Sequence, residues 1–225
     1  MLIVVTGTGT GIGKTHFSEA LLLAARAAHL SAAGVKPIES GVTATGPCDA
    51  DRLRAASTFH VKPFGRALTA PVSPHLAARH ERNPIQVEPI LAEIRSLRPA
   101  LDLLLVELPG GLFTPIAPPI LNIDLASALH PDTLLLVAPD RLGVLHDVIA
   151  ATRAARIHPL RIDGIVLTPP RSPDPSFCQN AQDIPLLTEG TRVLATLPWG
   201  NPDTLAATGL LTPLLPSPTR IPRLP

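Results

Sequence analysis

The chain has 225 residues, a length that fits one large α/β domain, and 45% of them are hydrophobic although only 3% are aromatic. Its 19 basic and 18 acidic residues give a net charge of +1 without a Lys/Arg cluster, which argues against a nucleic-acid-binding surface. Since no run of about 18 apolar residues, no signal-peptide pattern and no CxxC pair is present, we expect a cytoplasmic protein without a membrane span.

The first predicted elements are a buried strand at 2–5 (LIVV) and a helix at 14–30, which is rich in Ala and Leu and free of Pro and Gly. Between them runs the glycine-rich loop TGTGTGIGKT (6–15). It misses the strict phosphate-binding P-loop pattern by one residue, because Thr8 stands where that pattern has its first glycine. The loop is therefore one residue longer than the standard pattern.

A glycine-rich loop between a strand and a helix still presents backbone N–H groups and a helix N-terminus to an anion. We therefore expect Lys14 to reach the outer phosphates of a nucleotide and the Thr15 hydroxyl to bind Mg²⁺. The alternative is a flexible turn with a surface lysine.

A second buried strand is predicted at 33–38 (AGVKPI). Lys36 near its end is out of place unless it points into a polar cleft, the alternative being a lysine that extends to solvent at the sheet edge. Asp49 and Asp51 follow in a polar segment, which we expect to be a solvated turn.

A helix at 86–97 precedes a third buried strand at 102–107, which ends in Glu107. A carboxylate at the end of a buried strand near a phosphate-binding loop is a typical Mg²⁺ ligand. The sequence therefore predicts that Glu107 lies beside the loop as a Mg²⁺ ligand.

The rest of the chain continues the alternation. Further strands are predicted at 133–138, 163–167 and 192–197, and further helices at 121–129 and 143–157. This order predicts a mostly parallel central sheet with helices on both faces, where ligands bind outside the carboxyl ends of the strands. The Pro-rich end, 213–225, predicts an extended arm, either packed on the body or partly disordered.

Taken together, these segments resemble the dethiobiotin synthetase family, which carries the same lengthened loop. The resemblance covers nearly the whole chain in order. It continues through KPIESG (36–41), CDADRL (48–53), APVSPHLAA (70–78), VELPGGLFTPI (106–116), RLG (141–143) and LPW (197–199).

The resemblance implies a single P-loop NTPase-like domain over 1–225, with about seven strands, that works as a homodimer. It implies that 7,8-diaminononanoate and CO2 are the substrates and that ATP and Mg²⁺ are the cofactors, while the composition already argues against a nucleic acid or a membrane as a partner. One amine forms a carbamate, ATP activates the carbamate as a carbamic-phosphoric mixed anhydride, and the second amine closes the ring.

Site residues follow from the same resemblance. The implied catalytic residues are Lys14, Lys36 and Ser40, and the implied Mg²⁺ ligands are Thr15, Asp49 and Glu107. The implied nucleotide contacts are Thr10, Gly11, Ile12, Gly13, Lys14, Thr15, His16, Thr168 and Pro198. Lys36 and Ser40 also bind the diamine, whose carboxylate would meet the partner subunit's helix start at Leu142, Gly143, Val144 and Leu145.

Four positions depart from the family pattern. Leu108 and Pro109 stand where the family has Gly-Ala in its Glu-Gly-Ala-Gly-Gly segment, and Pro109 removes a backbone N–H and restricts Leu108 to extended conformations. Thr168 replaces the asparagine that reads adenine, and His146 replaces another asparagine.

Two other functions fit a P-loop chain. One is a related ATPase that amidates a cobyrinic-acid-type substrate, but those relatives usually carry a glutaminase domain. The other is a nucleotide-switch protein, a class that typically has a lysine where this chain has Thr8.

Overall fold

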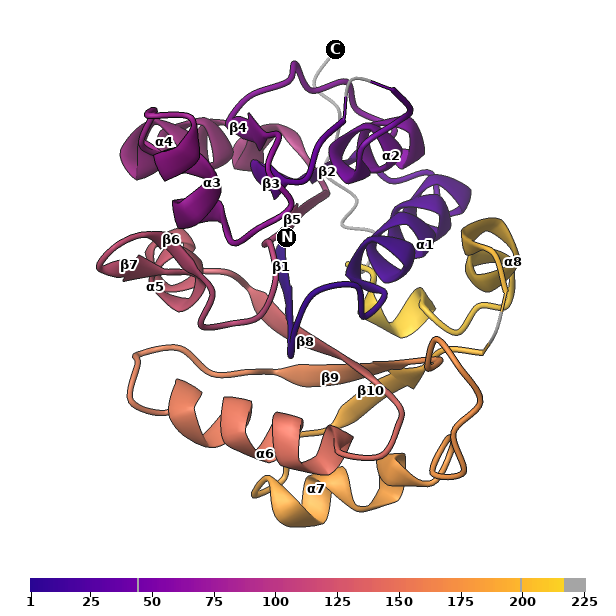
Figure 1. Ribbon diagram of the computed structural model, residues 1–225. Helices are drawn as coiled ribbons and strands as arrows, with labels where there is room; N and C mark the ends of the chain where they lie inside the picture. Colours follow the sequence, from indigo (N-terminus) through magenta and orange to yellow (C-terminus); the bar gives the residue numbers. More distant parts are fainter. Residues whose placement is uncertain (44, 199, 217–225) are drawn as a thin grey trace.

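Six parallel strands form the central sheet of the computed structural model, which describes residues 1–43, 45–198 and 200–216 (Figure 1). Their order across the sheet is β10-β9-β8-β1-β5-β2, and every adjacent pair is parallel. The strands are β1 (Leu2–Gly7), β2 (Ala32–Val35), β5 (Leu103–Glu107), β8 (Thr133–Pro139), β9 (Gly164–Thr168) and β10 (Val193–Thr196). They match the six strands predicted from the sequence, so the predicted fold class is confirmed. The family resemblance had implied about seven.

Two small sheets lie beside the central one. One pairs β3 (Ile38–Ser40) with β4 (Arg66–Leu68), and the other pairs β6 (Pro115–Ala117) with β7 (Ile120–Leu121). The predicted strand 33–38 is thus divided between β2 and β3. Pro37 causes the division, because it has no N–H for the ladder of the central sheet and its carbonyl oxygen accepts from the Arg66 N–H at 2.8 Å. Lys36 therefore lies just beyond the carboxyl end of β2.

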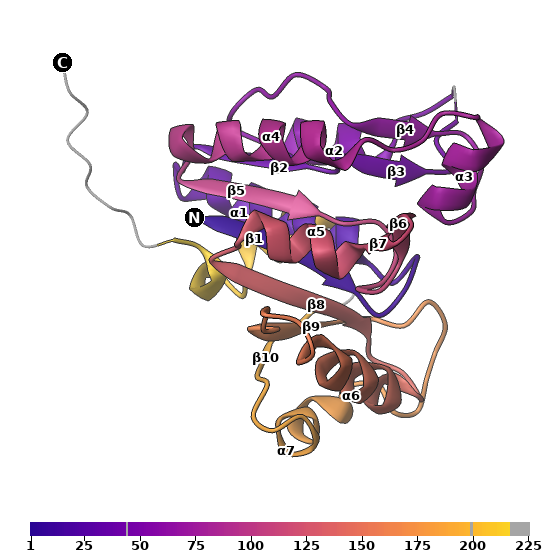
Figure 2. The same ribbon diagram turned by 90° about the vertical axis from the view of Figure 1, so that its left-hand side faces the viewer.

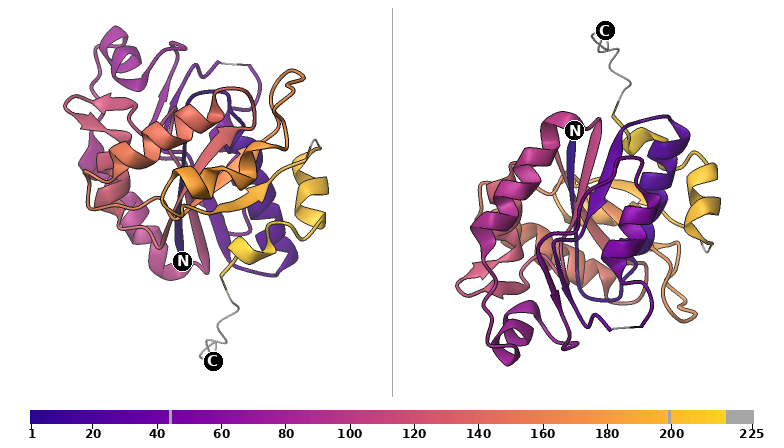
Figure 3. Two further views of the ribbon diagram at one scale, coloured as in Figure 1. Left: turned by 90° about the horizontal axis from the view of Figure 1, so that it is seen from below. Right: turned by 90° about the horizontal axis from the view of Figure 1, so that it is seen from above.

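Helices cover both faces of the sheet, as Figures 2 and 3 show. The α-helices are α1 (Lys14–Ala27), α2 (Asp49–Ala56), α3 (Pro74–His80), α4 (Val87–Leu97), α5 (Asn122–Leu129), α6 (Val144–Ala155), α7 (Ile184–Leu187) and α8 (Pro202–Ala207). The described ranges also contain three short 3₁₀ turns, η1 (Arg98–Ala100), η2 (Asn180–Gln182) and η3 (Thr212–Leu214). The four predicted helices are confirmed with ends shifted by up to three residues. The solvated turn expected at Asp49 and Asp51 is wrong, because both residues lie in the first turn of α2.

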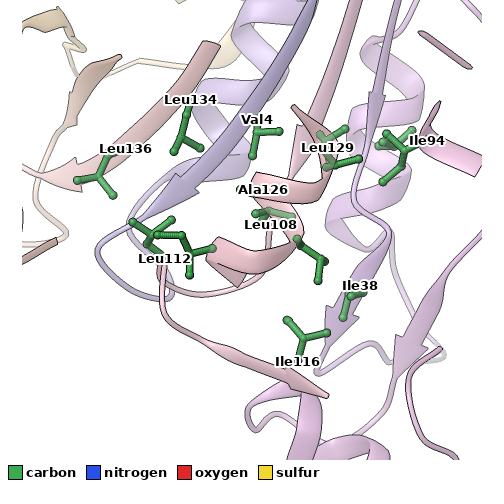
Figure 4. Close-up of a cluster of buried hydrophobic side chains, with 14 of the residues drawn as sticks. Val4, Ile38, Ile94, Leu108, Leu112, Ile116, Ala126, Leu129, Leu134 and Leu136 are labelled. Carbon is green, nitrogen blue, oxygen red and sulfur yellow. The ribbon is translucent and has the colours of Figure 1, made fainter. Parts of the chain in front are cut away.

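The hydrophobic core has two parts, because alternate residues of each strand point to opposite faces of the sheet. One part packs the sheet against α3 to α7, and Figure 4 shows Val4, Leu134 and Leu136 in it beside residues of the connecting segments. The other part packs Ile3, Val5 and Leu135 against α1, α2 and α8. Burial on both faces explains why the strands read as continuous apolar runs.

The predicted C-terminal arm begins packed against the body. Leu211 and Leu214, at and beside η3, are buried with the α1 side of the core. Residues 217–225 of the predicted arm lie outside the described part of the chain. Among the described helices, none is both long and apolar enough to span a membrane.

Candidate active site

The glycine-rich loop connects β1 to the first turn of α1. Gly11 and Gly13 adopt φ angles of 69° and 92°, in the left-handed region that glycine enters without strain, and Gly13 directly precedes the helix. The Lys14 side chain folds back over the loop, where its ammonium group donates to the Gly9 carbonyl oxygen at 2.8 Å. The longer loop thus keeps the strand-loop-helix geometry of an anion site.

The sheet order brings Lys36 and Glu107 together at the edge where this loop lies. β5 is hydrogen-bonded between β1 and β2, so the carboxyl ends of the three strands are neighbours. Lys36 Nζ lies 2.9 Å from Glu107 Oε1. The Thr15 and Ser18 hydroxyls donate to the two oxygens of the same carboxylate, at 2.7 and 2.8 Å. Glu107 is fully buried, and its charge is met by one ammonium group and two hydroxyls.

Asp49 joins the cluster from the start of α2, where its carboxylate lies 2.5 Å from Lys36 Nζ. Glu39 fixes this helix start, since its carboxylate accepts from the Asp49 N–H at 2.8 Å and from the Ala50 N–H at 3.1 Å. The side chain of Glu39 therefore does for α2 what an N-cap does for an ordinary helix. The Asp51 carboxylate also accepts from the Cys48 N–H at 3.2 Å, so both side chains stabilise a helix start at Asp49 instead of a solvated turn.

The charges in the cluster alter one another's protonation. Burial by itself would lower the pKa of Lys36, but the Glu107 and Asp49 carboxylates outweigh burial and raise that pKa above its ordinary value. Burial lowers the pKa of Lys14 to about 8, against partial opposition from Glu107. Burial would raise the pKa of Asp49, but Lys36 outweighs it, so the pKa is lowered and the carboxylate stays charged.

The oxygen donors of this cluster fit Mg²⁺. Thr15, Asp49 and Glu107 offer one hydroxyl and two carboxylates, which are the hard ligands that Mg²⁺ prefers. The two carboxylates already share one cation, the Lys36 ammonium group. Within the described residues no group of three or more His, Cys, Asp or Glu could hold a metal ion. A Mg²⁺ ion here would complete its shell with phosphate oxygens and water.

A cavity of about 750 Å³ opens over the loop and gathers most of the predicted site. Its lining includes Thr10, Gly11, Ile12, Gly13, Lys14, Thr15, His16, Lys36, Ser40, Asp49 and Glu107. Ser40 lines the same cavity, and its hydroxyl oxygen is buried without a hydrogen-bond partner among the described residues. The structure thus brings the predicted phosphate, metal and catalytic residues to one place.

The other predicted residues lie elsewhere. Thr168 is 2% exposed and lies under the loop, where its hydroxyl donates to the Ile12 carbonyl oxygen at 2.6 Å. Pro198 is not among the residues that line the cavity. The segment from Leu142 to Leu145, at the start of α6, also does not line the cavity of its own chain, and the Leu142 side chain is 78% exposed.

The departure at Pro109 is accommodated locally. Leu108 is fully buried in the core that Figure 4 shows, and the Asn122 amide donates to the carbonyl oxygens of Pro109 and of Gly111, the latter at 2.8 Å. The missing N–H is thus offset by a buried side chain that holds the segment through its carbonyl groups.

Sequence analysis missed four residues of the site: Ser18, Glu39, Asn122 and Arg171. Ser18 could have been found, because on a helix it lies one turn beyond Thr15 and so faces the same strand end. Glu39 lies in the KPIESG segment of the family resemblance, but nothing in the sequence indicated its role there, and nothing marks Asn122 or Arg171, because these contacts join separate segments.

Comparison with known proteins gives relatives over most of the chain. A family model described as an AAA domain matches residues 2–205. The ATP-dependent dethiobiotin synthetase BioD of Anaeromyxobacter dehalogenans (strain 2CP-C) is 40% identical over 207 residues, which cover 89% of this chain and 91% of that protein. The protein of the same name from Caulobacter vibrioides (strain NA1000 / CB15N) is 36% identical over 175 residues, which cover 74% of this chain and 78% of that protein.

Solved structures share the fold at lower identity. A ParA family ATPase from Chlorobium tepidum TLS aligns with a TM-score of 0.56 at 12% identity, covering 94% of this chain and 87% of that one. The septum site-determining protein MinD of Pyrococcus horikoshii OT3, solved with Mg-ADP, aligns with a TM-score of 0.55 at 17% identity, covering 94% and 85%. At these identities the likeness concerns the fold alone.

Proposed function

The chain belongs to the family of ATP-dependent dethiobiotin synthetases, and from this premise we propose that it carries out that ligation in biotin biosynthesis. The reaction joins 7,8-diaminononanoate and CO2 and consumes one ATP. The observation that supports it most directly is the pairing of Lys36 with Glu107 and Asp49 beside a phosphate-binding loop. This pairing brings acidic, basic and phosphate-binding groups together at the carboxyl ends of neighbouring strands.

The proposed reaction has three steps. An amine of the substrate adds to CO2 and loses a proton, which gives a carbamate. A carbamate oxygen then attacks the γ-phosphorus of ATP and ADP departs, which gives the mixed anhydride. The second amine attacks the anhydride carbon, loses a proton and expels inorganic phosphate as the ring closes.

The residues of the cavity have separate parts in these steps. The loop N–H groups and Lys14 hold the phosphates, and Lys36 and Ser40 stabilise the carbamate and the transferred phosphoryl oxygens. Thr15, Asp49 and Glu107 would hold Mg²⁺, which supplies positive charge to the phosphate oxygens when bound. Phosphoryl transfer depends mainly on positioning and on charge stabilisation, and these groups are of the kind that such a step needs.

We also propose that the enzyme works as a homodimer in the cytoplasm. The start of α6, from Leu142 to Leu145, would receive the substrate carboxylate in the cavity of the partner subunit. In support, Leu142 is exposed and this segment does not line the cavity of its own chain. Light scattering at assay concentration tests the dimer, and a fully active monomer would contradict it.

The activity is tested by incubating the purified protein with MgATP, 7,8-diaminononanoate and bicarbonate. We expect dethiobiotin to form in a one-to-one ratio with phosphate, and ATP hydrolysis to depend on both the diamine and bicarbonate. Hydrolysis that the diamine does not stimulate would reject the proposal and favour a nucleotide switch.

A further inference from the structure

Arg171 lies against the phosphate-binding loop although it is distant from it in sequence. Its Nε donates to the Gly11 carbonyl oxygen at 3.0 Å, and it lines the same cavity of about 750 Å³ as Lys14. A Cβ atom on Gly11 would stand 2.3 Å from Nη2 of Arg171, so the guanidinium group lies directly against the backbone of the loop. In this position Arg171 is next to the residues that line the anion site.

The end of β9 determines this position. Thr168 is tied to the Ile12 carbonyl oxygen, and Pro169 and Pro170 have no N–H and a restricted backbone. Arg171 is the next residue with a polar side chain, and it reaches the loop one residue before Ile12. The last residue of β9 and the segment after it therefore bind two consecutive carbonyl groups of the loop.

The guanidinium group has hydrogen-bonding capacity to spare. The exposed Arg171 forms no ion pair and no second hydrogen bond with any residue of the described ranges. Arg52, the other arginine at the cavity, is instead paired with Glu19 at 2.5 Å and lies 3.7 Å from Asp49. The terminal nitrogens of Arg171 are therefore available to a ligand of the cavity.

Lys14 and Arg171 are both anchored to the loop, through the carbonyl groups of Gly9 and Gly11, so two cations border one anion site. A guanidinium group stays protonated at any physiological pH and can grip a phosphate through two parallel hydrogen bonds. Arginines that contact the transferred phosphate in this manner accelerate phosphoryl transfer in other nucleotide hydrolases.

We propose that Arg171 is a phosphate-binding residue whose terminal nitrogens contact the outer phosphates of the nucleotide in this cavity. The inference rests on the proposed function only in that the ligand is a nucleoside triphosphate. Its experiment measures nucleotide binding, so it can be judged apart from the ligase activity.

The experiment is isothermal titration of ATP, ADP and AMP, with Mg²⁺ present, into the wild type and into Arg171→Ala and Arg171→Lys. We expect Arg171→Ala to weaken ATP binding about tenfold, as for the loss of one exposed charge-assisted contact, to weaken ADP binding less, and to leave AMP unchanged. Arg171→Lys should recover part of the loss, since it keeps the charge. The matched control is Arg192→Ala, an exposed arginine before β10 at the opposite end of the sheet, which should bind ATP as the wild type does.

A second readout separates a phosphate contact from mere support of the loop. Salt screens an exposed charge contact, so the ATP affinity of Arg171→Ala should fall less steeply with ionic strength than that of the wild type. An unchanged salt dependence together with no recovery in Arg171→Lys would overturn the proposal in favour of loop support through Gly11. An equal loss of affinity for ATP and AMP would overturn it in favour of stacking on the base. Unchanged ATP affinity in Arg171→Ala would overturn it outright. If the wild type binds ATP but forms no dethiobiotin, only the proposed function fails.

Discussion

The ammonium group of Lys36 lies 2.9 Å from a carboxylate oxygen of Glu107, a side chain that is fully buried. The two residues are 71 positions apart in the sequence and meet because β2 and β5 are adjacent parallel strands. A buried carboxylate depends strongly on such a partner, since removal of one member of a buried pair leaves an uncompensated charge. Consequences for stability and for catalysis can therefore be tested at the same pair.

Replacement of Lys36 by alanine should lower both the stability and the turnover of the protein. Without Mg²⁺, we expect Lys36→Ala to lower the free energy of unfolding by about 3 kcal/mol, because Glu107 and Asp49 lose their shared cation. Added Mg²⁺ should restore part of this loss, and turnover should fall at least about 100-fold. Thermal unfolding in EDTA and in Mg²⁺, beside a product assay, measures these effects. Intact product formation would show that Lys36 has no catalytic part.

Glu107→Gln tests the metal assignment with a substitution of equal size. The amide is neutral and cannot supply the charge that a Mg²⁺ ligand needs, so we expect turnover to fall on the order of 100-fold at saturating MgATP. The control is Glu93→Gln, the same change at an exposed position on α4, which should leave activity unchanged. Near-normal activity of Glu107→Gln would exclude this residue as a ligand.

Glu39 should act through Asp49, because its carboxylate binds the N–H groups at the start of α2. We expect Glu39→Ala to raise the Mg²⁺ concentration for half-maximal activity about tenfold. This is the lower end of the losses in metal affinity that follow removal of a group that orients a metal ligand. The rate at saturating Mg²⁺ should change much less, and Glu39→Gln, which keeps one acceptor oxygen, should be intermediate. A lower melting temperature with an unchanged Mg²⁺ requirement would mean that Glu39 only caps the helix.

Lys14 should make stability depend on pH in the absence of nucleotide and metal. Burial lowers its pKa to about 8 from 10.5, so between these values the unfolded chain binds more protons at this side chain than the folded protein. The contribution of Lys14 to the free energy of unfolding must therefore rise with pH across that window. Lys36 does not oppose this rise between pH 8 and 10.5, because the pKa of Lys36 is raised and its contribution to stability is lost only above about pH 10.5.

The measurement for Lys14 is thermal unfolding of the wild type and of Lys14→Met in EDTA across that pH range. The stability of the wild type relative to Lys14→Met should increase between about pH 8 and 10.5. A constant difference would show that Lys14 titrates normally in the folded protein.

Nucleotide selectivity should be weak. The Thr168 hydroxyl is already bound to the Ile12 carbonyl oxygen, and the two prolines that follow offer no N–H, so the adenine-reading pair expected of an asparagine is missing. A bidentate base contact provides about 1–3 kcal/mol of discrimination, by analogy with nucleic-acid recognition. Without it, we expect ATP to exceed GTP or CTP by less than about tenfold in kcat/KM. A side-by-side assay of the four triphosphates with saturating diamine tests this, and a hundredfold preference for ATP would show that other groups read the base.

The local sequence determined the elements and the phosphate-binding loop. The apolar run at 2–5, the glycines before Lys14 and the helix-forming segment after it act within a few residues, so their pattern is visible in the chain. The six strands of the central sheet could be predicted for the same reason, because most of their residues are buried and apolar, although β10 is only partly buried. The ends of the strands could not be predicted from the sequence, as the division of the predicted strand 33–38 at Pro37 shows.

Only the tertiary structure decided which side chains meet. Lys36 contacts Glu107, Glu39 caps α2 at Asp49, and Arg171 rests on Gly11. Each contact joins segments that are adjacent in space but not in sequence. The order of the strands sets the first, and the exits of β2 and β9 set the other two. The sequence shows which residues can carry a charge. The energy of that charge depends on its burial and on the groups within a few ångströms of it, which are properties of the folded chain.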